Sequence, residues 1–144
     1  MKSALLRAAV CAGIVMGLGV GAHAADTTMR VSHQLPPQHP MARQIDAWAE
    51  SIRALSDQTI DVQVFPTEQL FRAGDNYPAV AKGDVECAFS INSQWGATIP
   101  EMNFSLRPYS VTDMAVLKNW DGSQPAQTME QLLREKGVHN VAWF

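Results

Sequence analysis

Residues 40–66, PMARQIDAWAESIRALSDQTIDVQVFP, join a helical pattern to a strand pattern and decide the fold. In the first half, apolar residues recur at alternating steps of four and three, a spacing that gathers side chains on one face of an α-helix. That face comprises Met41, Ile45, Trp48, Ile52 and Leu55. The stretch also opens on a proline, which suits the first turn of a helix because its missing N–H has no helical partner there.

The second half of the stretch predicts a β-strand over Ile60–Phe65, because apolar and polar residues alternate until a proline ends the run. Further strands are expected on both sides of it, at residues 28–33, 85–91 and, more weakly, 102–106, with a last one beginning at residue 138. Helices are expected between them, at residues 76–82, 113–120 and 125–136. Strands that alternate with helices predict an α/β domain with a mainly parallel sheet.

The N-terminus has the three parts of a cleavable secretory signal peptide. Lys2 and Arg7 supply the positive start, and an apolar run over residues 8–20 follows. That run is shorter than the roughly 20 residues that a membrane-spanning helix needs, and it contains several glycines, so an uncleaved anchor is disfavoured. Small residues close the segment. We therefore expect cleavage after about Ala24, with residues 25–144 exported to the periplasm and not inserted in the membrane.

Charge and cysteine content narrow the class of the exported part. The whole chain has a net charge of −3, and residues 1–24 hold two basic residues and no acidic one, which leaves about −5. An acidic surface repels phosphates, so neither nucleic acid nor an anionic membrane is expected as a partner. Cys87 is the single cysteine after residue 24, so no intramolecular disulfide can form and the fold depends on its core.

In a parallel α/β sheet, ligands gather at the carboxyl ends of the strands. The residues there are mostly neutral hydrogen-bonding groups with aromatic neighbours, which suit recognition of a small polar solute. Further along, Arg107 interrupts an otherwise apolar strand end, and a guanidinium can bind a carboxylate through two hydrogen bonds. The candidate ligand-binding residues are His33, Gln34, Ser90, Asn92, Trp95 and Arg107.

Each candidate also has a structural role open to it. His33 could satisfy a buried turn, and Gln34 and Asn92 could cap loops. Trp95 could belong to the core as readily as to a stacking surface. Arg107 could cover apolar surface with its stem while its charge stays in water.

No catalytic or metal site is expected. The histidines lack the spacing of a helix-borne metal pair, and the sequence has no nucleophile elbow, phosphate-binding glycine loop or paired-carboxylate motif. Cys87 could in principle act as a nucleophile, but it shares a strand face with Val85 and Phe89, which favours a buried, inert thiol. We therefore expect no enzyme and no cofactor.

Three runs carry a family resemblance, in this order: MRVSHQLPPQHPMARQIDAWAESI, IDVQVFPTEQL and AVAKGDVECAFSINSQWGATIPEMNFSLRPY. They resemble the substrate-binding proteins of tripartite ATP-independent periplasmic (TRAP) transporters, of the dicarboxylate-binding (DctP) type. The resemblance covers residues 29–144. It implies a type II periplasmic-binding-protein-like fold, whose two α/β lobes close on a small carboxylate and deliver it to membrane permease subunits. It implies no catalysis.

By this resemblance, Gln34 corresponds to the family's polar residue after the first strand, with His33 beside it. Ser90 to Asn92 correspond to the residues after the third strand and lead into Trp95. The family's leucine-proline-aromatic segment appears with Arg107 inserted, a departure that either tunes ligand choice or only shifts the loop.

The family's members are more than twice as long, and the arginine that clamps the ligand carboxylate would lie after residue 144. The apolar strand pattern is also still running at Phe144. We therefore expect residues 25–144 to be an incomplete N-terminal lobe that binds ligand weakly or not at all. Because a fold does not fix a function, a secreted or periplasmic sensory or enzymatic α/β domain is the alternative.

Overall fold

The computed structural model describes residues 25–143. The predicted signal peptide, residues 1–24, lies outside that range. Within it, no helix has the length and apolar character needed to cross a membrane.

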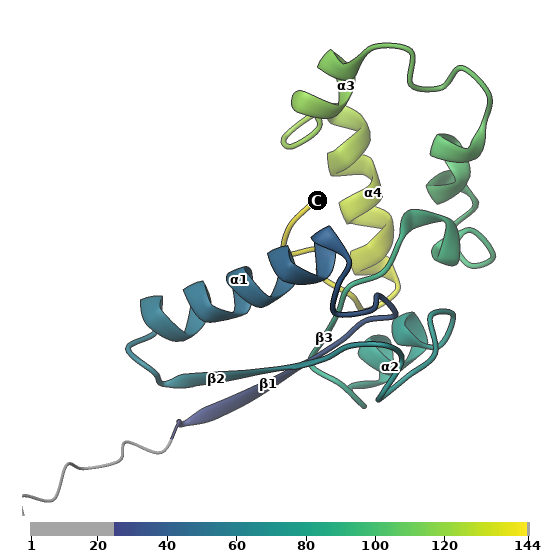
Figure 1. Cartoon of the computed structure of the whole chain (residues 1–144). Helices are drawn as coiled ribbons and strands as arrows, with labels where there is room; N and C mark the ends of the chain where they lie inside the picture. The colour runs from purple at the N-terminus through teal and green to yellow at the C-terminus, as the bar shows by residue number, and fades with distance from the viewer. Residues whose placement is uncertain (1–24, 144) are drawn as a thin grey trace, which may run out of the picture.

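Three strands, four α-helices and two 3₁₀ helices make up the described part (Figure 1). The first half alternates strands and helices: β1 (Thr27–Ser32), α1 (Pro40–Leu55), β2 (Ile60–Phe65), α2 (Asn76–Lys82) and β3 (Cys87–Ala88). The second half is helical: η1 (Asn92–Trp95), η2 (Pro100–Leu106), α3 (Met114–Lys118) and α4 (Gln124–Glu135).

The strands form one parallel sheet in the order β2-β1-β3, which confirms the predicted α/β architecture. β1 pairs with β2 along its whole length, from Thr27 opposite Ile60 to Ser32 opposite Phe65. Helix α1 connects β1 to β2 at one edge of the sheet, and α2 connects β2 to β3 at the opposite edge, on the other side of β1. Because such crossovers are right-handed, α1 and α2 cover opposite faces of the sheet.

Helix α1 begins at the predicted proline and ends at Leu55, and it buries most of the predicted face, since Ile45 lies in the first apolar cluster and Trp48 and Ile52 pack against that cluster. His39 caps its start, where the ring Nδ1 accepts a hydrogen bond from the Met41 N–H at 3.2 Å. The buried residues are Ala42, Ile45 and Ala49. Leu55, predicted to lie on the buried face, is 86% exposed. The predicted stripe repeats every 3.5 residues, so it drifts by about 20° per seven residues on a helix of 3.6 per turn, and its last member turns away from the sheet.

Two apolar clusters hold the described part together. The first joins α1 to the sheet and contains the buried residues Val31, Ile45, Ala49 and Val62. The second lies between η2 and α4 and contains the buried residues Ile99, Met102, Met129 and Leu133. Cys87 packs against the first cluster, and burial raises the pKa of its thiol, in line with the predicted inert role.

Three strand predictions are wrong in extent or type. The strand predicted over residues 85–91 is reduced to Cys87–Ala88, and Ile91 is exposed. Residues 102–106 lie in η2, a 3₁₀ helix that starts with a proline in its first turn. Residues 138–143 form no strand. A strand needs a neighbour to pair with, and in the described part β3 has only β1 beside it.

An ion pair fixes β1 to the segment that leads into β3. The Arg30 guanidinium donates from Nε to Glu86 Oε2 at 2.8 Å and from Nη2 to Glu86 Oε1 at 2.7 Å. The Arg30 backbone N–H also donates to Glu86 Oε2, and Nη2 reaches the Asp84 carbonyl oxygen. The hydrogen bond from Arg30 is the main cause that lowers the pKa of Glu86 from 4.5 to about 2.

This ion pair should make the stability of the fold depend on pH, and Glu86→Gln should remove that dependence. The folded pKa lies below the unfolded one, so the pair's contribution is present above about pH 4.5 and is lost as the pH falls toward about 2. We expect Glu86→Gln to lower the urea midpoint of unfolding at pH 6 and to lower it less at pH 3. The effect is modest because water screens a pair that is more than one-third exposed. An equal difference between variant and unmodified protein at both pH values contradicts the assignment.

Candidate functional site

A cavity of about 660 Å³ opens beside β3. Its walls come from β1, from β3 and the residues that follow it, from α1 and α2, and from η2, α3, α4 and residues 138–143. Of the six residues predicted to bind ligand, Ser90, Asn92 and Trp95 line this cavity. All three follow β3, so the carboxyl end of that strand places them together.

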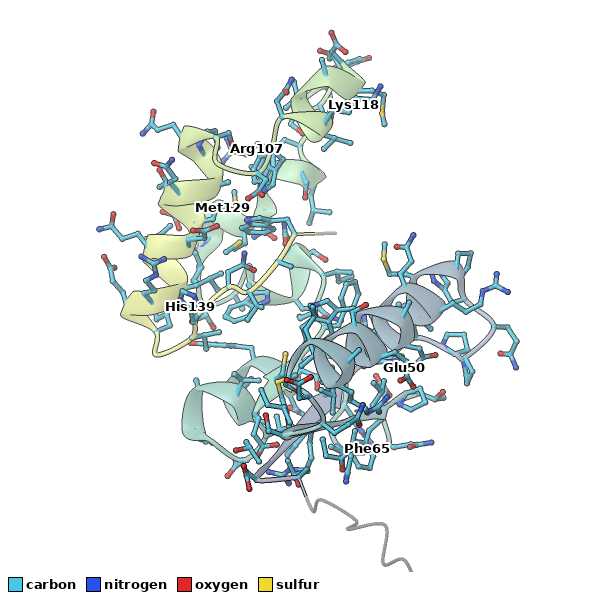
Figure 2. The ribbon with its side chains drawn as sticks, turned by 90° about the vertical axis from the view of Figure 1, so that its left-hand side faces the viewer. Glu50, Phe65, Arg107, Lys118, Met129 and His139 are labelled. Atoms are coloured by element: carbon cyan, nitrogen blue, oxygen red, sulfur yellow. The ribbon has the colours of Figure 1, made fainter. Side chains whose placement is uncertain are left out.

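Arg107 does not line the cavity. It is exposed and caps the end of η2 with extended backbone. Figure 2 shows Arg107 toward one end of the molecule and Phe65, the last residue of β2, toward the other. In the described part, the sheet's strand ends and this guanidinium are therefore not brought together.

Two further residues shape the loop after β3 and were not predicted from the sequence. The Ser90 hydroxyl donates to Gln94 Oε1 at 2.7 Å, which ties the loop to the first turn of η1. Tyr77 of α2 packs against Trp95, with ring centroids 4.2 Å apart and planes tilted by 39°. Trp95 also packs against the second apolar cluster, so its ring belongs to both the core and the cavity wall.

His33 follows β1 and is 1% exposed. Its backbone N–H donates to the Phe65 carbonyl oxygen at 3.1 Å, and its own carbonyl oxygen accepts from the Glu68 N–H at 3.1 Å. The ring Nδ1 accepts from the Leu35 N–H at 3.2 Å, which places the proton of a neutral ring on Nε2. Burial lowers the pKa of His33, against the opposing charge of Asp46. His33 thus holds the turn after β1 as a neutral side chain.

The loops after β1 and β2 are joined through their backbones. The Thr67 N–H donates to the Leu35 carbonyl oxygen at 3.2 Å. Thr67 and Glu68 both have left-handed backbone, with φ of 54° and 60°. Beside them, Gln34 Oε1 is buried and has no hydrogen-bond partner among residues 25–143. Strand ends held this firmly can keep a few polar groups in fixed positions, as recognition of a small solute requires.

Within residues 25–143, no group of three or more His, Cys, Asp or Glu side chains could hold a metal ion. The chemistry at the strand ends is that of neutral hydrogen-bonding groups beside an aromatic wall. Such groups bind and orient a ligand.

Residues 31–144 match the DctP family, described as bacterial extracellular solute-binding protein, family 7. The chain belongs to this family. The match confirms the resemblance found in the sequence, and the family is one of transport proteins rather than enzymes.

Relatives of known name or structure agree with this family. The C4-dicarboxylate-binding protein DctB of Bacillus subtilis is 27% identical over 108 residues, which are 74% of this chain and 31% of DctB. A TRAP periplasmic solute-binding protein from Sulfurospirillum deleyianum, solved with bound succinate, is 25% identical with a TM-score of 0.72, over 79% of this chain and 37% of that one.

A TRAP periplasmic solute-binding protein from Roseobacter denitrificans, solved with bound β-D-glucuronate, shares the fold with a TM-score of 0.74 at 19% identity. The match covers 81% of this chain and 39% of that one. The predicted type II periplasmic-binding-protein-like fold is therefore confirmed. The chain spans about a third of the length of these family 7 relatives.

Proposed function

We propose that this chain is part of an extracytoplasmic receptor that captures a small organic acid for a TRAP transporter. The observation that carries the proposal is the family 7 match over residues 31–144. Support for the ligand class comes from the Sulfurospirillum deleyianum relative, whose structure holds succinate. The neutral polar groups after β1 and β3 suit a carboxylate, since N–H and O–H donors form strong hydrogen bonds to a charged oxygen.

The proposed binding residues are the six predicted from the sequence, and they fall into three groups. Ser90, Asn92 and Trp95 form one wall, beside β3. Gln34 supplies an amide at the end of β1, where His33 holds the turn. Arg107 is proposed to reach a ligand only if its loop moves, because it does not line the cavity.

The family is extracytoplasmic. Residues 1–24 are proposed to act as a signal peptide cleaved after about Ala24, which leaves residues 25–144 in the periplasm. That part is proposed to form an N-terminal lobe of the receptor, with a second lobe covering the ligand from the other side. TRAP membrane permease subunits are the proposed partners that accept the ligand.

The proposal predicts that Asn92→Ala and Gln34→Ala each weaken binding of succinate or malonate by about tenfold or more. The reason is that a hydrogen bond to a charged group contributes about 1.5–3 kcal/mol. Affinity is measured by NMR titration of the purified protein, which also detects millimolar dissociation constants. Asn119→Ala is the matched control, because Asn119 is an exposed amide that bonds only within α3 and its cap.

The control is expected to bind as the unmodified protein does. If Asn92→Ala and Gln34→Ala also retain full affinity, the carboxylate binds elsewhere and the assigned site is wrong.

A further inference from the structure

Two fully buried polar side chains, Ser32 and Asn76, have no hydrogen-bond partner among the described residues. Both residues are 0% exposed. The atoms concerned are the Ser32 hydroxyl oxygen and both the oxygen and the nitrogen of the Asn76 amide. Neither residue lines the cavity beside β3, so they do not belong to the proposed carboxylate site.

The topology places both side chains in one layer of the molecule. Val31 packs with Ile45 and Ala49 of α1, and successive side chains of a strand point to opposite faces, so Ser32 points away from α1. That other face is the one that α2 covers. The buried residues of α2 are Asn76 and Ala79, which lie one turn apart on the same side of the helix.

Buried side-chain amides and hydroxyls in folded proteins nearly always have a hydrogen-bond partner, either protein or ordered water. An asparagine side chain can form four hydrogen bonds and a serine hydroxyl three. Most of these hydrogen bonds therefore lack a protein partner in this layer. A metal ion does not suit it, because both groups are neutral and no metal-binding cluster occurs in residues 25–143. A buried water that makes about three hydrogen bonds does suit it.

We propose that the layer between β1 and α2 holds a buried water molecule that bridges the Asn76 amide and the Ser32 hydroxyl. The proposed water lies next to residues that support the strand-end loops. Ser32 directly precedes His33 and Gln34, and Asn76 directly precedes Tyr77, whose ring packs on Trp95. The bridging water therefore ties together the two elements that support the loops after β1 and β3.

A double-mutant cycle with Ser32→Ala, Asn76→Leu and the double variant tests this inference. Each substitution removes one side of the same bridge. We therefore expect each single variant to raise the equilibrium constant for unfolding about tenfold, as measured by urea unfolding. The double variant should then lose little more than the worse single variant. Ser51→Ala, an exposed serine of α1 whose hydroxyl bonds to the Ala47 carbonyl oxygen, is the control and should change little.

Additive losses, or a gain in stability in Asn76→Leu, would overturn the proposal, since the two groups then share no partner. A crystal structure of the unmodified protein tests it even if a variant does not fold. The proposal expects one ordered water about 2.7–3.2 Å from both side chains. A direct bond between Ser32 and Asn76, or a dry layer, contradicts it.

Discussion

Replacing Ile45 with alanine should lower the free energy of unfolding by about 4 kcal/mol. Ile45 is 1% exposed and lies at the centre of the first apolar cluster, between α1 and the sheet. Truncation of a buried isoleucine to alanine costs about 2–5 kcal/mol, because transfer free energy is lost and a cavity remains. Urea unfolding followed by tryptophan fluorescence, to which Trp48 beside the same cluster contributes, measures the change.

Leu55→Ala is the control on the same helix. Leu55 belongs to the same apolar pattern in the sequence but is 86% exposed, so its truncation should change stability by no more than about 0.5 kcal/mol. If Ile45→Ala does not fold, Ile45→Val should still lose about 0.5–1.5 kcal/mol. Equal losses at the two positions would mean that Leu55 is buried as the sequence pattern predicted, and not exposed as it is in the structure.

Replacing Trp120 with alanine should cost about 3 kcal/mol, near the lower end of the range for tryptophan truncation because the ring is only half-buried. The ring stacks on Phe104, with centroids 5.1 Å apart and planes within 5°, and meets the edge of Trp143 at 5.7 Å. Aromatic pairs of this kind add to the stability gained by burial. Urea unfolding at neutral pH measures the loss.

Tyr109→Ala provides the comparison for Trp120, since Tyr109 is a large aromatic residue that is 91% exposed. Its truncation should have almost no effect. If Trp120→Ala lowers the free energy of unfolding no more than Tyr109→Ala does, the contacts of the Trp120 ring with Phe104 and Trp143 do not stabilise the fold.

The elements that the sequence predicts well are those whose pattern is local. Alternation over Ile60–Phe65 reproduces β2 to the residue, and periodicity with a first-turn proline reproduces α1. The buried face of α1 was predicted in part: Ile45, Trp48 and Ile52 are in or against the core, but Leu55 is exposed, and the buried alanines Ala42 and Ala49 were missed because small residues add little to an apolar pattern. Strand extent was also missed after residue 85, because it depends on which segment lies alongside, and local pattern does not contain that information.

The candidate site shows the same division. Ser90, Asn92 and Trp95 were expected to lie together because they follow one strand, and they line one cavity. Tyr77 was missed, because its contact with Trp95 joins residues that are distant in the sequence and Tyr77 sits in an ordinary helical pattern. Arg107 was grouped with the others by its chemistry alone, and it does not line the cavity, although Leu106 directly before it does.

The strand-end loops of this chain are proposed to recognise a carboxylate. The most direct measurement is an NMR titration of isotope-labelled protein with succinate, with every assigned backbone amide followed. We expect weak binding, because the chain spans about a third of the length of its relatives, and we expect the shifted amides to cluster at residues 33–34 and 90–95. Shifts confined to α3 and α4 would contradict this assignment of the site.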